Sequence, residues 1–265
     1  MTMAYYLGID IGSGTSKGVV TRNGDVVALH SFRSGVNYKL AGQKLRDELL
    51  AKAKLSMKDT ASTVATGQGA GLVDYADRKI ADIRCCAQGM NSIFPEVRTI
   101  IDVEGQSTYV LKINEKGQVI NFITSERCAG GAGRFLDIIA NVLQVPIEEI
   151  GSLSLKSNGP IVFTTACAVF GESEAVSRVA EGASKEDILA GVHKALAEKI
   201  SSMVDRVGME PEYGMCGGGA MNKGLVVWVQ RRLGVELLVP PEPQYVTAIG
   251  AAIFAREPVN KTFSS

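Results

Sequence analysis

The sequence lacks the features of a secreted, membrane-bound or nucleic-acid-binding protein. Lysine and arginine number 28, as do aspartate and glutamate, so the formal net charge is zero and gives no electrostatic reason to expect nucleic acid as a partner. The longest apolar run, near residues 160–171, is shorter than the roughly 18 residues of a membrane span. The start of the chain lacks both the basic segment and the apolar segment that a signal peptide has. We therefore expect a cytoplasmic protein that binds neither nucleic acid nor membrane.

Cysteine and histidine are scarce, which argues against two further kinds of protein. The cysteines number five, an odd count that suits a reduced compartment better than a disulfide scaffold. There is no C-x-x-C pair, and His30 and His193 are far from each other and from any cysteine pair, so a self-contained zinc site is not expected. We interpret Cys85, Cys86 and Cys216 as core residues. His193 is expected at the surface of a helix, or partly buried there.

A glycine-rich loop, residues 11–17, follows the first predicted strand, residues 5–10. The spacing of its glycines matches neither the dinucleotide-binding fingerprint nor the P-loop. A second strand follows directly, and Asn23-Gly24 predicts a type I′ hairpin turn into a third strand, residues 26–32. Rossmann and P-loop folds place a helix at this point. The sequence therefore predicts an antiparallel meander.

The pattern D-x-G-[ST]-x-x-[ST]-K at Asp10–Lys17 resembles the phosphate-binding hairpin of the sugar kinase, Hsp70 and actin superfamily. Backbone N–H groups at Gly12 and Gly14 can approach phosphate oxygens, and Asp10 can hold Mg²⁺ through water. The predicted side-chain donors to phosphate are Ser13, Thr15, Ser16 and Lys17. A simple glycine hairpin without a ligand is the alternative.

The same pattern of strand, acidic residue, glycine turn and strand returns at residues 99–110, and a third strand is predicted at 119–124. This is an internal duplication. We expect an α/β protein with a duplicated, ribonuclease-H-like fold of the actin, Hsp70 and sugar kinase type, in which ATP lies between two lobes. The boundaries are 1–95 for the first lobe and 96–265 for the second. The last helix, 245–256, is assigned to the second lobe, with the alternative that it packs back on the first.

Two stretches of the second lobe are expected to complete the fold near a nucleotide. A long helix, 184–207, should begin with a capping box made by Ser184 and Asp187. After a strand at 213–216, a glycine-rich turn opens a helix that runs to Leu233, and three glycines would let a flat adenine ring and ribose lie against backbone. The adenosine-binding residues predicted here are Gly217, Gly218, Gly219, Ala220 and Asn222. The small residues of the last helix should allow close packing.

Two cysteines each precede a predicted helix. Cys128 lies in a glycine-rich turn before a helix with an apolar face that begins near Phe135. Cys167 precedes a helix predicted at 172–181. Free amide groups and the positive dipole end at a helix N-terminus favour a thiolate, which is a metal ligand. Buried structural thiols are the alternative.

The chain as a whole resembles the ATPase family that contains the activators of 2-hydroxyacyl-CoA dehydratases and the ATP-binding subunits of benzoyl-CoA reductase. The two cysteine motifs distinguish this family from sugar kinases and Hsp70 proteins. The resemblance covers nearly the whole chain, and its most specific segments are Gly8–Ser13, Cys128–Leu136, Cys167–Glu174, Gly217–Ala220 and Ala248–Ala252.

The resemblance implies one [4Fe–4S] cluster held between two subunits, each of which supplies Cys128 and Cys167. Such a cluster requires four thiolates, and two-fold symmetry is the commonest way to double the two that this chain offers. ATP hydrolysis would then drive an electron of low potential to an iron–sulfur dehydratase or reductase component. A ferredoxin- or flavodoxin-like protein would be the donor.

The second phosphate loop departs from the family's usual D-I-G-G-Q-D. Here Glu104 replaces a glycine and Ser107 replaces an acid. An added carboxylate near a γ-phosphate costs affinity, recruits metal or orients the attacking water, so hydrolysis could be slowed or differently timed. A divergent copy is also compatible with a heterodimer, so both a homodimer and a heterodimer with a homologous subunit remain open.

Our leading hypothesis is thus an ATP-hydrolysing electron-transfer protein. Asp10 and Asp102 would position Mg²⁺, Gln106 with Glu104 would orient the water, and the backbone of Gly105 would approach phosphate. The alternatives are a small-molecule kinase of the same fold and a nucleotide-gated scaffold protein without a cluster.

Overall fold

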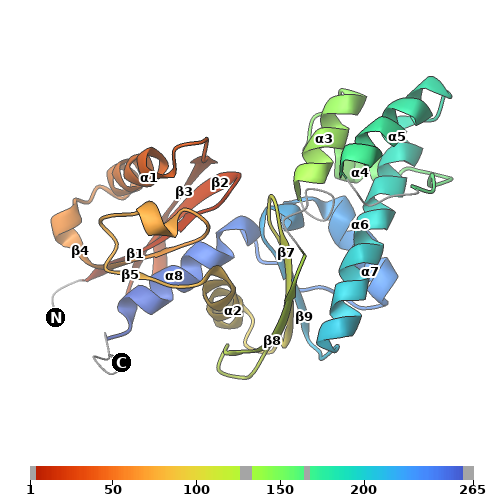
Figure 1. Cartoon of the computed structure of the whole chain (residues 1–265). Coiled ribbons are helices and arrows are strands. Elements are labelled where there is room, and N and C mark those ends of the chain that lie inside the picture. Colours follow the sequence, from red (N-terminus) through yellow and green to blue (C-terminus); the bar gives the residue numbers. More distant parts are fainter. Residues whose placement is uncertain (1–3, 126–132, 164–167, 259–265) are drawn as a thin grey trace. The chain divides into compact units, whose positions relative to one another are not determined.

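The computed structural model describes residues 4–125, 133–163 and 168–258. The chain divides into two compact units, Met1–Ile93 with Tyr245–Ser265, and Phe94–Gln244. Each unit is built on its own mixed sheet with helices against it (Figure 1). Among the described residues no helix is long and apolar enough to cross a membrane.

The first unit has a five-stranded sheet in the order β3-β2-β1-β4-β5. The first three strands form the predicted antiparallel meander, and β4 pairs with β1 in parallel. Both residues of the hairpin turn have positive φ, 56° at Asn23 and 101° at Gly24, as a type I′ turn requires. The strands are β1 Tyr5–Ile11, β2 Thr15–Arg22, β3 Asp25–Arg33, β4 Thr60–Thr66 and β5 Arg78–Lys79.

Helices cover both faces of this sheet (Figure 1). Leu45 and Leu49 of α1 pack with Ile9 on one face. On the other face Val19 packs with Ala248 of α8. Burial on both faces explains why β1 is apolar through most of its length. The helices and short 3₁₀ turns are α1 Tyr38–Ala53, η1 Met57–Asp59, η2 Ala70–Leu72, α2 Asp82–Ile93, η5 Pro243–Tyr245 and α8 Val246–Arg256.

The last helix packs unusually close to its neighbours through glycine. A Cβ at Gly250 would lie 1.8 Å from the carbonyl oxygen of Cys85 on α2, and one at Gly89 would lie 2.1 Å from that of Val246. On the sheet side, a Cβ at Gly8 would lie 1.9 Å from the carbonyl oxygen of Ala248. The backbones of β1, α2 and α8 therefore touch, and α8 belongs to the same compact unit as the first strands.

The second unit repeats the first sheet with one strand fewer. Its order is β8-β7-β6-β9, with an antiparallel meander and a final parallel strand, as in β3-β2-β1-β4. The predicted duplication is confirmed at the level of strand order and direction. The strands are β6 Thr99–Val103, β7 Thr108–Ile113, β8 Val119–Thr124 and β9 Tyr213–Cys216.

The helices of the second unit share one apolar core with this sheet, in which Val103, Phe135 and Leu196 take part.

Two details of these helices differ from expectation. Helix α5 starts at Ala168, before the predicted start at residue 172. The expected capping box is only half formed. Ser184 Oγ accepts from Asp187 N at 3.1 Å, but the Asp187 carboxylate accepts from Ser157 Oγ at 2.5 Å. The elements are α3 Gly133–Leu143, α4 Ile150–Ser154, α5 Ala168–Ala180, α6 Lys185–Val207, η4 Gly218–Met221 and α7 Lys223–Leu233.

The close packing of α8 gives a test of the first unit. Alanine normally stabilises a helix by about 1 kcal/mol relative to glycine. We expect Gly250→Ala to lower the free energy of unfolding by roughly 1–3 kcal/mol or more, because the new methyl group overlaps a carbonyl oxygen of α2. Gly42→Ala on α1 is the matched control, because its Cβ would meet nothing nearer than Val73 Cγ2 at 3.4 Å. Urea unfolding measures both variants, and equal effects would contradict the packing.

Candidate functional site

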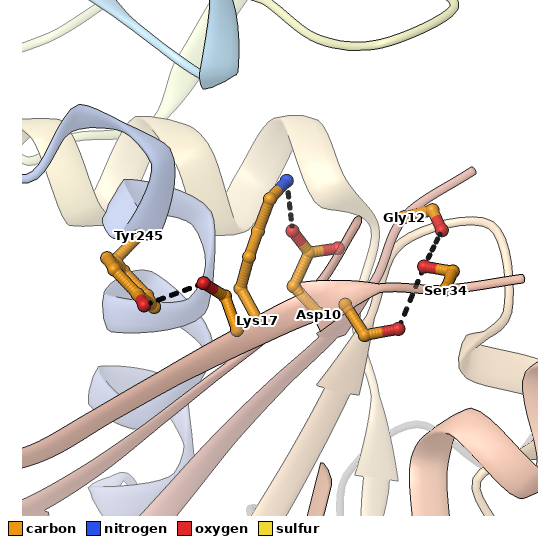
Figure 2. A network of polar contacts seen from close by, with 7 residues as sticks. Asp10, Gly12, Lys17, Ser34 and Tyr245 are labelled. Carbon is orange, nitrogen blue, oxygen red and sulfur yellow. Dashed lines mark hydrogen bonds and ion pairs between the residues drawn. The ribbon is translucent and has the colours of Figure 1, made fainter. Parts of the chain in front are cut away.

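The turn between β1 and β2 holds a buried ion pair. Asp10 and Lys17 are cross-strand partners, and Lys17 Nζ lies 3.1 Å from Asp10 Oδ2 (Figure 2). Both residues are almost fully buried, 3% and 2% exposed. Gly12 N donates to the carbonyl oxygen of Thr15 at 3.2 Å and closes the turn. A carboxylate and an ammonium group are therefore held beside the predicted phosphate loop.

Ser34, which no sequence motif singles out, donates a hydrogen bond to this turn (Figure 2). Its Oγ donates to the carbonyl oxygen of Gly12 at 2.7 Å, and its N–H donates to that of Gly14 at 3.0 Å. Ser16 Oγ lies 2.9 Å from Ser34 Oγ, and Ser16 is fully buried. Ser16 thus braces the turn from inside, which differs from its predicted role as a phosphate donor. The register of the hairpin, in which Thr15 faces Arg33, is the signal that could have identified Ser34.

The outer side of the turn is open. Gly14 is exposed, and a Cβ built on it would meet no atom within 4 Å. Ser13 and Thr15 on either side of it are half-buried. A Cβ at Gly12 would lie 2.8 Å from the carbonyl oxygen of Thr15, so Gly12 is required by the turn itself. The N–H groups near Gly14 are therefore accessible to an anion, while Gly12 shapes the loop.

The segment after β4 packs against Asp10. Gly67 has a φ of 82°, and a Cβ on it would lie 2.3 Å from Asp10 Oδ1. Gly69 N donates to the carbonyl oxygen of Ile11 at 2.9 Å. The turn at residues 67–71 is thus tied to the phosphate loop by a hydrogen bond and by close contact.

The second unit repeats this arrangement around Asp102, which is 3% exposed. Gly217 has a φ of 80°, and a Cβ on it would lie 2.4 Å from Asp102 Oδ1. Gly219 packs on Val103, whose Cγ1 would be 2.4 Å from an added Cβ. The turn is closed by Glu104 N, which donates to the carbonyl oxygen of Ser107 at 2.9 Å. Its predicted residues Glu104, Gly105 and Gln106 are all half-buried.

This second turn also holds the start of α3. Gly133 N donates to the carbonyl oxygen of Glu104, and Arg134 N to that of Gly105, each at 2.9 Å. From the sequence we expect free amide groups at the N-terminus of this helix. Two of them are already bonded to the loop, so the described start of α3 is anchored mechanically and does not offer these donors to an anion.

The glycine-rich turn before α7 is held by Asn222. Asn222 Oδ1 accepts from Leu225 N at 3.0 Å and so caps α7, and its Nδ2 lies 3.0 Å from His193 Nε2. The side chain predicted to contact adenosine is therefore engaged within the protein. Gly218 is exposed with no atom within 4 Å of an added Cβ, so backbone at this point is open to a ligand. Ala220 is buried.

His193 is fully buried, so the expectation of a surface or partly buried residue is wrong. Its Nδ1 lies 2.7 Å from the carbonyl oxygen of Leu189, which assigns the ring proton to Nδ1 and leaves Nε2 to accept from the Asn222 amide. Burial lowers the pKa of His193 to about 4. The neutral ring thus fixes which way the Asn222 amide points.

The predicted cluster ligands, Cys128 and Cys167, lie outside the described residues. The helices that follow their motifs, α3 and α5, pack against each other (Figure 1). A Cβ at Gly171 of the second motif would lie 2.7 Å from Phe135 Cζ of the first. The described parts of the two motifs therefore meet.

Cys85, Cys86 and Cys216 are buried, as interpreted from the sequence. Burial is the largest cause that raises the pKa of Cys85 to about 12, while a hydrogen bond with Thr66 opposes the rise. A thiol with such a pKa stays protonated at neutral pH and does not act as a thiolate.

Comparison with known proteins identifies relatives along the whole chain. A model of the BadF/BadG/BcrA/BcrD ATPase family matches residues 7–255. The 2-hydroxyisocaproyl-CoA dehydratase activator of Clostridioides difficile is 40% identical, covering 95% of this chain and 94% of that protein. The (R)-2-hydroxyglutaryl-CoA dehydratase activating ATPase of Acidaminococcus fermentans is 36% identical, with 95% and 96% covered. One subunit of the benzoyl-CoA reductase of Thauera aromatica is 30% identical, with 95% and 93% covered.

Solved structures agree on the fold. The activator of the 2-hydroxyisocaproyl-CoA dehydratase from Clostridium difficile, with bound ADPNP, superimposes with a TM-score of 0.91 at 40% identity, over 95% of this chain and 94% of that one. Ethanolamine utilization protein EutJ from Carboxydothermus hydrogenoformans shares the fold at a TM-score of 0.63 and 18% identity, over 96% and 91% of the two chains. The duplicated sheet is thus that of actin-, Hsp70- and sugar-kinase-like ATPases.

The buried imidazole of His193 predicts a pH dependence of stability. The unfolded chain binds a proton at His193 near pH 6.5, whereas the folded chain does so only near pH 4. Between these values the unfolded state holds more protons, so stability falls as pH falls, by up to about 1.4 kcal/mol per pH unit. We expect His193→Gln to flatten this dependence in urea unfolding between pH 7 and 5. An unchanged slope in His193→Gln would contradict the assignment.

Proposed function

The chain belongs to the BadF/BadG/BcrA/BcrD ATPase family, and we propose that it couples ATP hydrolysis to electron transfer through a [4Fe–4S] cluster shared by two subunits. The electron acceptor is a 2-hydroxyacyl-CoA dehydratase or a benzoyl-CoA-reductase-type enzyme. The observation that carries the proposal is the link between the turn of Asp102 and helix α3, which begins five residues after Cys128. A change at the nucleotide can be passed through this link to the cysteine motif.

The first part of the proposal concerns ATP. The relative with bound ADPNP supports a nucleotide site, and each unit has open backbone that could contact a nucleotide, at Gly14 in the first and at Gly218 in the second. We assign Asp10 and Asp102 to Mg²⁺, and the first turn with Lys17 to the phosphates. Lys17 Nζ would lie 3.7 Å from a Cβ on Gly12, so its charge is already at the turn. Oxygen ligands of this kind suit Mg²⁺, which keeps several waters when one or two carboxylates bind it.

The second part concerns the cluster. Cys128 and Cys167 of each subunit would hold it, because a [4Fe–4S] centre takes four thiolates. The contact between Gly171 and Phe135 supports a shared site, since it brings the described parts of the two motifs together. When bound, the cluster supplies a one-electron carrier of low potential. The residues of this chain contribute the ligands and the helices that position them.

The third part concerns partners. Helix α5 leaves apolar side chains in solvent, with Phe170 66%, Val176 53% and Val179 47% exposed. Such a surface directly after Cys167 supports a second subunit there, either an identical one or a homologue. The higher identity to dehydratase activators than to the reductase component favours a dehydratase as the enzyme served. A ferredoxin- or flavodoxin-like protein completes the proposed route as donor.

Anaerobic purification followed by iron and acid-labile sulfide analysis tests the cluster. We expect about four irons per dimer, the content of one [4Fe–4S] centre. Cys128→Ala should abolish the visible spectrum and the iron while ATP binding is kept, because the ligand is lost and the phosphate turns are not. Cys216→Ala, a buried core cysteine, is the control and should keep its iron. An iron-free wild type from careful anaerobic work would contradict the proposal.

A pair of glycine variants tests the first turn. Gly14→Ala should fold as the wild type does, because its Cβ meets no atom within 4 Å, yet it should bind ATP roughly tenfold more weakly because the methyl group occupies the open side. Gly12→Ala should instead lower the free energy of unfolding by about 1–3 kcal/mol, since its Cβ approaches the Thr15 carbonyl oxygen. Calorimetric titration with ATP and urea unfolding separate the two effects. Unchanged affinity in Gly14→Ala would remove this turn from the nucleotide site.

A further inference from the structure

The turn after β4 is built like the glycine-rich turn after β9. Gly67 and Gly217 have nearly the same φ, 82° and 80°. A Cβ on Gly67 would touch the carboxylate of Asp10, and a Cβ on Gly217 would touch that of Asp102. Two residues later, Gly69 packs on Ile11 and Gly219 packs on Val103. In both cases a Cβ added to the glycine would lie 2.4 Å from a methyl carbon of that side chain. The internal duplication therefore extends beyond the strands, to the turns that follow them.

One residue of the first turn has a functional side chain where the second has none. The middle position is exposed in both turns, and it is Gln68 in the first and Gly218 in the second. The pairing of β1 with β4 is parallel, and Asp10 pairs with Thr66. Gln68 thus follows the carboxyl end of β4 directly beside the carboxyl end of β1, the edge at which α/β sheets bind ligands.

Gln68 is held in this place by its neighbours. On one side Gly67 contacts the Asp10 carboxylate, and on the other Gly69 N donates to the Ile11 carbonyl oxygen at 2.9 Å. Neither glycine has room for a side chain, so the backbone of the turn is fixed against the phosphate loop. A primary amide in this position offers both a donor and an acceptor, one residue after the glycine that contacts Asp10.

We propose that Gln68 is a catalytic residue of the ATPase, which orients the attacking water at the first phosphate turn. Its amide oxygen accepts from the water and its NH₂ group donates to an oxygen of the γ-phosphoryl group. The water oxygen bonds to the γ-phosphorus as the bond from that phosphorus to the β–γ bridging oxygen breaks. The products are ADP, inorganic phosphate and one proton, which leaves through a phosphate oxygen. A polar side chain that positions water is the usual contribution of protein at this step.

This inference rests on the proposed ATPase function and adds a residue to it. The sequence predicts that Gln106, together with Glu104, orients the water, and Gln68 is a further candidate from the first unit. Gln106 occupies the position in the second turn that Gly14 occupies in the first, as the closing hydrogen bonds Gly12–Thr15 and Glu104–Ser107 show. Gln106 is half-buried within its turn, whereas the side chain of Gln68 is exposed.

Steady-state hydrolysis and ATP binding, measured on the full chain purified anaerobically, test the proposal. Gln68→Ala should lower kcat roughly 10–100-fold, the range for loss of a group that acts in the transition state, and leave the Kd for ATP within about threefold. Gln68→Glu should also lower kcat, because it keeps the length but removes the amide donor. Both variants should fold, since the replaced side chain is exposed. Gln118→Ala, at an exposed position between β7 and β8, is the matched comparison and should retain the wild-type kcat.

The possible results separate two failures. A wild type that neither binds nor hydrolyses ATP would overturn the ATPase proposal itself. A wild type that hydrolyses ATP, with Gln68→Ala at the same rate, would overturn only the role of Gln68. The same conclusion would follow from a Gln68→Ala variant whose loss lies entirely in Kd, because that pattern marks a binding contact and not an oriented water.

Discussion

The site depends on one steric constraint that occurs twice. In each unit a glycine with positive φ turns the chain directly against a buried aspartate, so that no side chain fits between them. Glycine adopts this backbone conformation at little cost, whereas other residues do not. A methyl group on Gly67 or Gly217 would also displace the carboxylate it touches. The constraint fixes Asp10 and Asp102 at the ends of β1 and β6, and the phosphate turns begin from those two points.

The two halves differ in how the buried acid is accompanied. Asp10 faces Lys17 across the hairpin, while the residue across from Asp102 is Tyr109. A buried ion pair has a large desolvation cost, which is offset only if both partners stay together. A metal ion at Asp10 would take over the neutralisation of the carboxylate and leave the Lys17 ammonium for phosphate. Lys17 can therefore neutralise Asp10 when no nucleotide is bound and contact phosphate when one is. The second turn has no equivalent lysine, because Tyr109 lies across from Asp102.

Much of the fold was predictable because short stretches of the sequence determine it. Strand alternation, the Asn23-Gly24 hairpin and the repeated acidic turn predicted the duplicated meander, and relatives confirm the fold. Contacts between distant segments were not predictable in the same way. Ser34 supports a turn about twenty residues earlier, and His193 fixes Asn222 across two helices, so neither leaves a local pattern. The close packing of the turn at Gly67 was not predictable either, because a glycine-rich sequence looks the same whether the chain is free or tightly packed.

The departure at Glu104 takes a different meaning once the backbone is considered. The sequence raised the question of whether replacing a glycine here disturbs the loop. Glu104 closes the turn with Ser107 and accepts from Gly133 through its backbone, and any residue except proline can supply these groups. Gly133 itself leaves ordinary space, since a Cβ on it would lie 3.4 Å from the Glu104 carbonyl oxygen. The link from the turn to α3 is therefore independent of the side chain at this position. The carboxylate that Glu104 adds takes no part in the two backbone hydrogen bonds that connect the turn to α3.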